Sequence, residues 1–178
     1  MKEYDKLLEL SKIEGTEIYM DTIWLFKRTL GQQIENADLL IKLLAIDNYF
    51  KKNTFGFKIY EKMQHIRTIT NKEIPEQIKN KKWKMEFEDL IKSFEKDGYI
   101  KDYPVELSKD FRVFNGSHRL CCALAFNIKK IPVKFTEKYI DRIWYDYSKE
   151  WFKVNGLENV EKHIDKKYQE LRKEFPLE

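Results

Sequence analysis

Residues 112–126 read RVFNGSHRLCCALAF, and this stretch decides the fold. A strand-like segment runs into Asn115 and Gly116, and an unbroken apolar run with the length of a short buried helix follows from Leu120. We expect a strand-to-helix junction there, with Ser117 at the start of the helix. Because the first N–H groups of a helix have no partner within it and carry partial positive charge, such a junction is suited to binding a phosphate.

Other residues of the junction favour the same interpretation. Gly116 permits a positive φ or a close approach of the backbone to a ligand. His118 and Arg119 add side-chain donors beside the helix start. The alternative is a glycine turn followed by a serine cap and an exposed arginine, a combination that occurs in many helices that bind nothing.

The composition indicates a compact, soluble protein. The chain has 178 residues, of which 42% are hydrophobic and 15% aromatic, and this is enough for one sizeable core. Its 34 Lys and Arg residues nearly balance 30 Asp and Glu residues, which leaves a formal net charge of +4. Since acidic residues interrupt most lysine-rich stretches, this charge argues only weakly for a nucleic-acid partner.

The cysteines, the first residues and the length of the apolar stretches indicate the cellular compartment of the protein. Cys121 and Cys122 are adjacent within the apolar run, so we expect two small buried side chains and not a disulfide framework. Such cysteines fit a reducing compartment. We expect a cytoplasmic protein, since residues 1–6 do not resemble a signal peptide and no stretch has the length of a membrane span. The three histidines are far apart, so we assign no metal-ligating residues.

Helices are predicted on both sides of the deciding stretch, from apolar residues that recur at helical spacing. A break is expected near Gly31, and Trp144 and Trp151 are expected to pack on the body of the protein. Residues 74–78, which include a proline, are predicted to form a turn or a short extended piece. The predicted helices cover residues 17–50, 57–67, 85–97, 140–152 and 160–175.

The hydrophobic period changes to that of strands after Gly98. Residues 104–107 and 111–114 are predicted to form a β-hairpin, and residues 131–135 are predicted to form a third strand. This order predicts an α+β fold, with a small sheet flanked by helices from both ends of the chain. We expect three parts, which are a helical N-terminal extension over 1–70, a core over 71–136 and a C-terminal helical extension over 137–178 that packs on the core.

The stretch from Phe87 to Phe135 resembles the ParB/sulfiredoxin superfamily. The likeness lies in an ordered set of motifs: a helix that ends near a glycine, a strand led by Pro104, a hairpin into a GxHR signature, an alanine-containing helix and an IPV strand. It implies a small mixed sheet of the ParB/sulfiredoxin type. It also implies that the signature loop binds the phosphates of a nucleotide, through Asn115, Gly116, Ser117, His118 and Arg119.

Two branches of that superfamily are disfavoured by particular features of the chain. Sulfiredoxins use a cysteine between the glycine and the histidine, where this chain has Ser117, so reduction of sulfinic acid by that chemistry is not expected. ParB partition proteins bind CTP and continue into a helix-turn-helix region. Here the residues after the core read as aromatic-rich packing helices, so DNA partitioning is not expected either.

A third branch, the free serine kinases, is similar in its loop. The chain resembles these kinases in two features. Their loop reads DGHHR where this chain has NGSHR, and they carry a glutamate beside an upstream proline, and this glutamate acts as the base. Glu76, which follows Pro75, matches that glutamate loosely in position. Asn115 replaces the aspartate of the kinase loop, and this puts the contacts of that carboxylate in doubt.

The resemblance implies a nucleotide-dependent kinase that acts on the hydroxyl of a small polar metabolite, such as an amino acid or a sugar precursor. The nucleotide would be ATP, ADP or CTP with Mg²⁺. His118 and Arg119 would stabilise the charge of the transferred group, and Glu76 would orient the hydroxyl. Two alternatives stay open, a nucleotide-binding regulatory or scaffold module and a nucleic-acid-processing protein. No membrane partner is expected, and a homodimer stays open.

Overall fold

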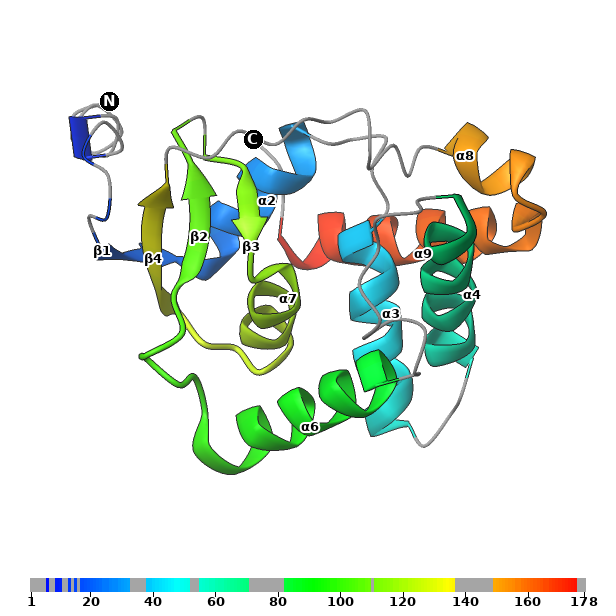
Figure 1. Ribbon diagram of the computed structural model, residues 1–178, viewed down its shortest axis with the longest axis horizontal. Coiled ribbons are helices and arrows are strands. Elements are labelled where there is room, and N and C mark those ends of the chain that lie inside the picture. The colour runs from blue at the N-terminus through cyan, green and yellow to red at the C-terminus, as the bar shows by residue number, and fades with distance from the viewer. Residues whose placement is uncertain are drawn as a thin grey trace.

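The computed structural model describes residues 17–32, 38–51, 55–70, 82–109, 111–136 and 149–175, with residues 6, 9, 10, 13 and 15 before them. Within these residues the chain is an α+β protein, as predicted (Figure 1). The strands are β1 (Glu17–Asp21), β2 (Val105–Ser108), β3 (Val113–Asn115) and β4 (Lys130–Thr136). The helices are α2 (Thr22–Gln32), α3 (Asp38–Phe50), α4 (Phe55–Thr70), α6 (Lys82–Asp97), α7 (Ser117–Ala125), α8 (Lys149–Val154) and α9 (Glu158–Glu174).

The four strands form one mixed sheet in the order β1-β4-β2-β3. β4 is antiparallel to β1 and parallel to β2, and β2 is antiparallel to β3 in the predicted hairpin. The register places Val105 of β2 opposite Val133 of β4, and both side chains are buried. Because two parallel neighbours need a crossover between them, the chain passes from β2 to β4 through β3 and α7.

The first strand corrects one prediction. Residues 17–50 were expected to be helical, but residues 17–21 form β1 at the edge of the sheet. Met20 is buried and Ile18 half-buried, whereas the residues between and beside them are exposed, which is the period of a strand. Asp21 then accepts a hydrogen bond from the N–H of Trp24 at 2.8 Å and so supports the first turn of α2.

Most of the other predicted elements are confirmed. α2 continues through Gly31 to Gln32 and α3 begins at Asp38, and the residues 33–37 between them lie outside the described residues. α6 ends before Gly98, whose φ of 70° is the left-handed conformation expected after a helix. Residues 74–78, Trp144 and most of the helix expected over 140–152 lie outside the described residues, as does the side chain of Trp151.

One hydrophobic core joins the sheet to the helices. Figure 1 shows the strands at one end of the molecule, with α7 between the sheet and α3. α3 in turn packs against α4, and Asp47 of α3 pairs with Lys167 of α9 at 2.5 Å. The residues expected as an N-terminal extension therefore contribute both a strand of the sheet and the helix that supports α7.

Candidate functional site

The strand-to-helix junction has the geometry that the sequence predicts. β3 ends at Asn115, and α7 begins at Ser117. Between them Gly116 has φ 95° and ψ 17°, a left-handed conformation that glycine adopts at little cost. No side chain caps the helix through a hydrogen bond. The N-terminus of α7 thus presents N–H donors, and the side chains of Ser117, His118 and Arg119 belong to its first turn.

Ser117 is held by a lysine from a distant part of the sequence. The ammonium of Lys42, on α3, donates a hydrogen bond to Ser117 Oγ at 2.7 Å. Lys42 is only 3% exposed and also pairs with Asp38, the first residue of α3. One turn further along α7, the thiol of Cys121 contacts the carbonyl oxygen of Leu39 at 3.6 Å. The start of α7 is therefore fixed against the first two turns of α3.

His118 is held by aromatic residues of two other helices. Its Nε2 lies 2.5 Å from the hydroxyl of Tyr60 on α4, and the Tyr60 side chain is almost completely buried. The imidazole also packs edge-on against the ring of Phe87 on α6, with 4.7 Å between ring centroids. These contacts set the position of the imidazole, so a ligand at the helix start meets a histidine whose orientation is already fixed.

Arg119 folds back over the glycine turn. A Cβ atom on Gly116 would lie 2.9 Å from Nη2 of Arg119, which shows how closely the guanidinium approaches. Nη1 donates a hydrogen bond to the carbonyl oxygen of Tyr103 at 2.6 Å, and the hydroxyl of Tyr99 donates to the same oxygen at 2.8 Å. Burial raises the pKa of Tyr99 to about 12, although the charge of Arg119 acts in the opposite direction, so this hydroxyl stays a neutral donor.

The structure does not bring all predicted site residues together. Gly116, Ser117, His118 and Arg119 are contiguous at the start of α7. Asn115 is exposed at the end of β3, where its amide donates to Glu106 Oε1 of β2 at 3.4 Å. Glu76 lies outside the described residues, so the structure gives no position for the predicted base.

Three contacts of the site come from residues that the sequence did not single out. Lys42 contacts Ser117, and Tyr60 and Phe87 contact His118. Only Lys42 left a signal, because it interrupts the apolar run LLIKLLAI of residues 39–46. A charge at the centre of a helix that is otherwise apolar indicates a buried cation with a specific partner.

The two cysteines are buried and free, as predicted. Burial raises the pKa of Cys122 to about 12 and holds the pKa of Cys121 well above its ordinary value. Because the thiolate is the reactive form of cysteine, neither side chain is suited to nucleophilic chemistry at neutral pH. Cys121 therefore does not replace the cysteine that a sulfiredoxin would carry at the position of Ser117.

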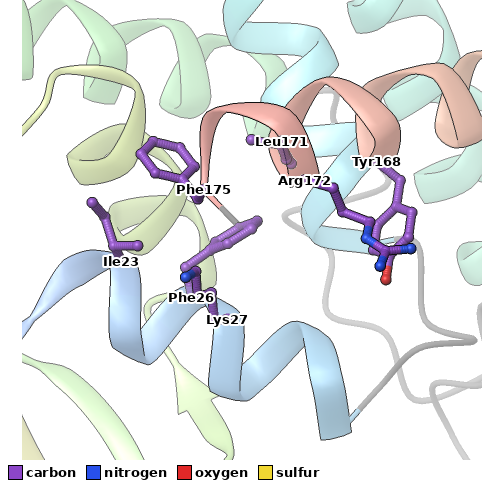
Figure 2. Close-up of a pocket in the computed structure, with 7 residues that line it drawn as sticks. All are labelled: Ile23, Phe26, Lys27, Tyr168, Leu171, Arg172 and Phe175. Atoms are coloured by element: carbon purple, nitrogen blue, oxygen red, sulfur yellow. The ribbon is translucent and has the colours of Figure 1, made fainter. Parts of the chain in front are cut away.

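A second surface feature is a groove between α2 and α9 (Figure 2). Its lining is apolar, although Lys27 and Arg172 are among the lining residues, and the guanidinium of Arg172 lies 5.8 Å from the ring centre of Tyr168. No residue of the α7 junction contributes to it. The groove is lined by Ile23, Phe26, Lys27, Tyr168, Leu171, Arg172 and Phe175.

Among the described residues, no cluster of His, Cys, Asp or Glu is large enough to hold a metal ion. In the same part of the chain, no helix has both the length and the apolar character needed to cross a membrane. Comparison of the chain with protein-family models, curated proteins and solved structures finds no match. The function is therefore inferred from the chemistry of the site itself.

Proposed function

We propose that the chain binds the phosphates of a nucleotide at the N-terminus of α7 and transfers a phosphoryl group to the hydroxyl of a small polar metabolite, such as an amino acid or a sugar precursor. The observation that carries this proposal is the convergence of three kinds of donor at one helix start. They are the backbone N–H groups, the hydroxyl of Ser117 and the cationic group of Arg119.

The start of α7 is suited to the negative charge of a phosphate. A helix N-terminus attracts an anion through oriented N–H groups and the helix dipole. Arg119 adds a positive charge beside the glycine turn. The left-handed glycine, which has no Cβ, lets the guanidinium of Arg119 lie close to the turn at the helix start. Together these features support a site for a multiply charged phosphate.

Phosphoryl transfer needs little beyond positioning and charge stabilisation. Fixed donors act on the outer oxygens of the transferred group, where negative charge is spread in the transition state. His118 and Arg119 take this part, with a divalent cation such as Mg²⁺ bound to the nucleotide. Glu76 is the proposed residue that orients the acceptor hydroxyl. The donor is ATP, ADP or CTP.

The proposal extends to the family and the compartment. The order of the hairpin, the glycine turn, α7 and β4 supports a sheet of the ParB/sulfiredoxin type, with the kinase branch as its relative in function. Two free buried thiols support a reducing compartment, the cytoplasm, where nucleotides are abundant.

The first test measures nucleotide binding. Isothermal calorimetry and thermal unfolding with ATP, ADP, CTP and GTP, each with Mg²⁺, are expected to reveal one preferred nucleotide, which stabilises the fold by about 2.7 kcal/mol at a hundred times its Kd. Arg119→Ala is expected to weaken this binding. Arg172→Ala, which removes an exposed arginine of α9, serves as the matched control.

The second test measures transfer. The preferred nucleotide is incubated with a panel of small hydroxyl compounds, and the loss of its terminal phosphate to an acceptor is followed by ³¹P NMR. A phosphorylated acceptor supports the kinase. Binding with no transfer to any acceptor would make the chain a nucleotide-binding regulatory module, and no binding of any nucleotide would contradict the proposal altogether.

A further inference from the structure

We infer that Lys42 is a phosphate-binding residue of the α7 site and that Asp38 is its positioning residue, so that α3 supplies part of the site. This inference rests on the proposed function, because it assigns a further residue to the same ligand. It goes beyond that function in one respect. The binding site is completed by a helix that lies more than seventy residues before the loop in the sequence.

The charge of Lys42 is buried. Lys42 is 3% exposed and lies within an apolar segment of α3, where its neighbours Ile41 and Leu43 are also buried. Lysine is almost never buried to this degree unless its ammonium is paired. A buried ion pair generally stabilises a fold no more than well-packed apolar residues of similar volume would. Stability alone therefore gives little reason for a lysine at this position.

The partners of the Lys42 ammonium are Asp38 and Ser117. The group has three N–H donors. Within the described part of the chain it has two partners, the carboxylate of Asp38 one turn earlier on α3 and the hydroxyl of Ser117. Among the described residues, one donor of the ammonium is therefore left for a third acceptor. A phosphate oxygen bound at the start of α7 would lie beside Ser117, within reach of this donor.

The same contact orients the hydroxyl of Ser117. Its oxygen accepts a hydrogen bond from Lys42, so its own hydroxyl proton is directed away from the ammonium. That proton is then oriented for donation to an anion. The contact with Lys42 thus does two things: it places a positive charge at the helix start, and it sets the direction in which Ser117 donates.

The same helix carries a matched control. Asp47 of α3 pairs with Lys167 of α9 at 2.5 Å, and the Lys167 side chain is 12% exposed. This is also a largely buried lysine–aspartate pair between α3 and another helix. Lys167, however, has no hydroxyl partner at the start of α7. A lysine that only supports packing should behave like Lys167, whereas a phosphate-binding lysine should not.

The experiment compares Lys42→Met with Lys167→Met. Methionine keeps the length and flexibility of the side chain and removes its charge. Affinity for inorganic tripolyphosphate and for Mg²⁺–ATP is measured by calorimetry, and the stability of each variant is measured by urea unfolding. Lys42→Met is expected to weaken binding of both probes about ten- to a hundredfold, the range of a hydrogen bond to a charged group. Lys167→Met is expected to change stability and leave both affinities unchanged.

A second variant guards against a folding defect. Removal of Lys42 alone takes away the ammonium that pairs with the Asp38 carboxylate, whereas Asp38→Asn/Lys42→Met removes both charges of this pair. The double variant is expected to fold and still to bind weakly. Equal affinity of the folded Lys42 variants and the native chain would overturn the inference and leave the proposed function standing. Failure of the native chain to bind either probe would instead contradict the proposed function.

Discussion

At the scale of single residues, position 116 requires glycine for two reasons, its backbone conformation and the closeness of the Arg119 side chain. Its φ of 95° is a conformation that costs an L-residue about 1–2 kcal/mol, and an added Cβ would lie 2.9 Å from the guanidinium of Arg119. We predict that Gly116→Ala lowers the free energy of unfolding by about 1–2 kcal/mol and also weakens nucleotide binding, because Arg119 is displaced from the carbonyl oxygen of Tyr103. Urea unfolding and calorimetry measure the two effects.

Gly98 provides the control for Gly116. It also has a positive φ, of 70°, but a Cβ there would meet no atom within 4 Å. Gly98→Ala should therefore lose comparable stability through the backbone and keep its affinity for nucleotide. A Gly116→Ala protein that binds as tightly as the native chain would show that the position of Arg119 does not matter for the ligand.

The contact between Tyr60 and His118 gives a second prediction at this scale. Tyr60→Phe keeps the ring that packs on Phe87 and removes only the hydroxyl 2.5 Å from the imidazole. We expect a loss of about 1 kcal/mol in unfolding free energy, the usual contribution of one hydrogen bond, together with weaker nucleotide binding because the imidazole is less firmly oriented. Tyr168→Phe on α9 is the comparison variant, and unchanged affinity in Tyr60→Phe would separate His118 from the ligand.

At the scale of elements, the sequence predicted those that a single hydrophobic period defines. The hairpin, α6, α7 and β4 lie where the pattern placed them. β1 was predicted as helix because Ile18 and Met20, two positions apart and close to the helical run that follows, do not distinguish the periods. Its strand conformation depends on pairing with β4, whose residues come more than a hundred positions later. A local pattern contains no information on such a partner.

The residues of the site also divide into those that a local pattern predicts and those that depend on tertiary packing. The glycine turn and the helix start at Ser117 are local features, and both were predicted from the residues of the loop. Lys42 and Tyr60 were not, because their roles depend on how α3 and α4 pack against α7. Only the tertiary structure brings these three helices together.

The packing of α3 on α4 makes a prediction of its own. Gly56 of α4 is buried against α3, and a Cβ there would lie 2.3 Å from the carbonyl oxygen of Leu44. Because that neighbour is backbone, Gly56→Ala must push the two helices apart. We expect a loss of at least about 1–3 kcal/mol in unfolding free energy, the range for an overpacked core. We also expect weaker nucleotide binding, because Tyr60 lies one turn further along α4.

Urea unfolding and calorimetry test this prediction, with Gly156→Ala as the control. Gly156 has no atom within 4 Å of the added Cβ, although its φ of 71° carries the backbone cost. If Gly56→Ala proved no less stable than Gly156→Ala, the close approach of α3 and α4 would be wrong.

At the scale of the whole molecule, α7 belongs both to the site and to the hydrophobic core. α3, α4 and α6 contact its polar first turn, and its remaining turns carry Leu120, Cys121, Cys122 and Ala123 into the core. A change that loosens the core around α7 should therefore also disturb the site. The two buried thiols in that core make the free energy of unfolding depend on pH, and this dependence reports whether the core is closed to water.

Burial raises the pKa of Cys122 from 9.0 to about 12, and it raises the pKa of Cys121 in the same direction. The folded state thus keeps protons that the unfolded chain releases above about pH 9. This contribution to stability is complete below pH 9 and is lost as pH rises from there towards 12, by at most about 1.4 kcal/mol per pH unit for each thiol. Urea unfolding between pH 7 and 10.5 is expected to show this decline.

Burial also raises the pKa of Tyr99, from 10.0 to about 12, so Tyr99 adds to the same decline and the test is a comparison of slopes. Cys122→Ala removes one of the buried thiols and should lose less stability between pH 9 and 10.5 than the native chain does, whatever its stability at pH 7. Parallel curves for the two proteins would mean that Cys122 ionises as easily in the folded state as in the unfolded chain. In that case the core around α7 would admit water. The packing that fixes Ser117 and His118, in the first turn of the same helix, would then be weaker.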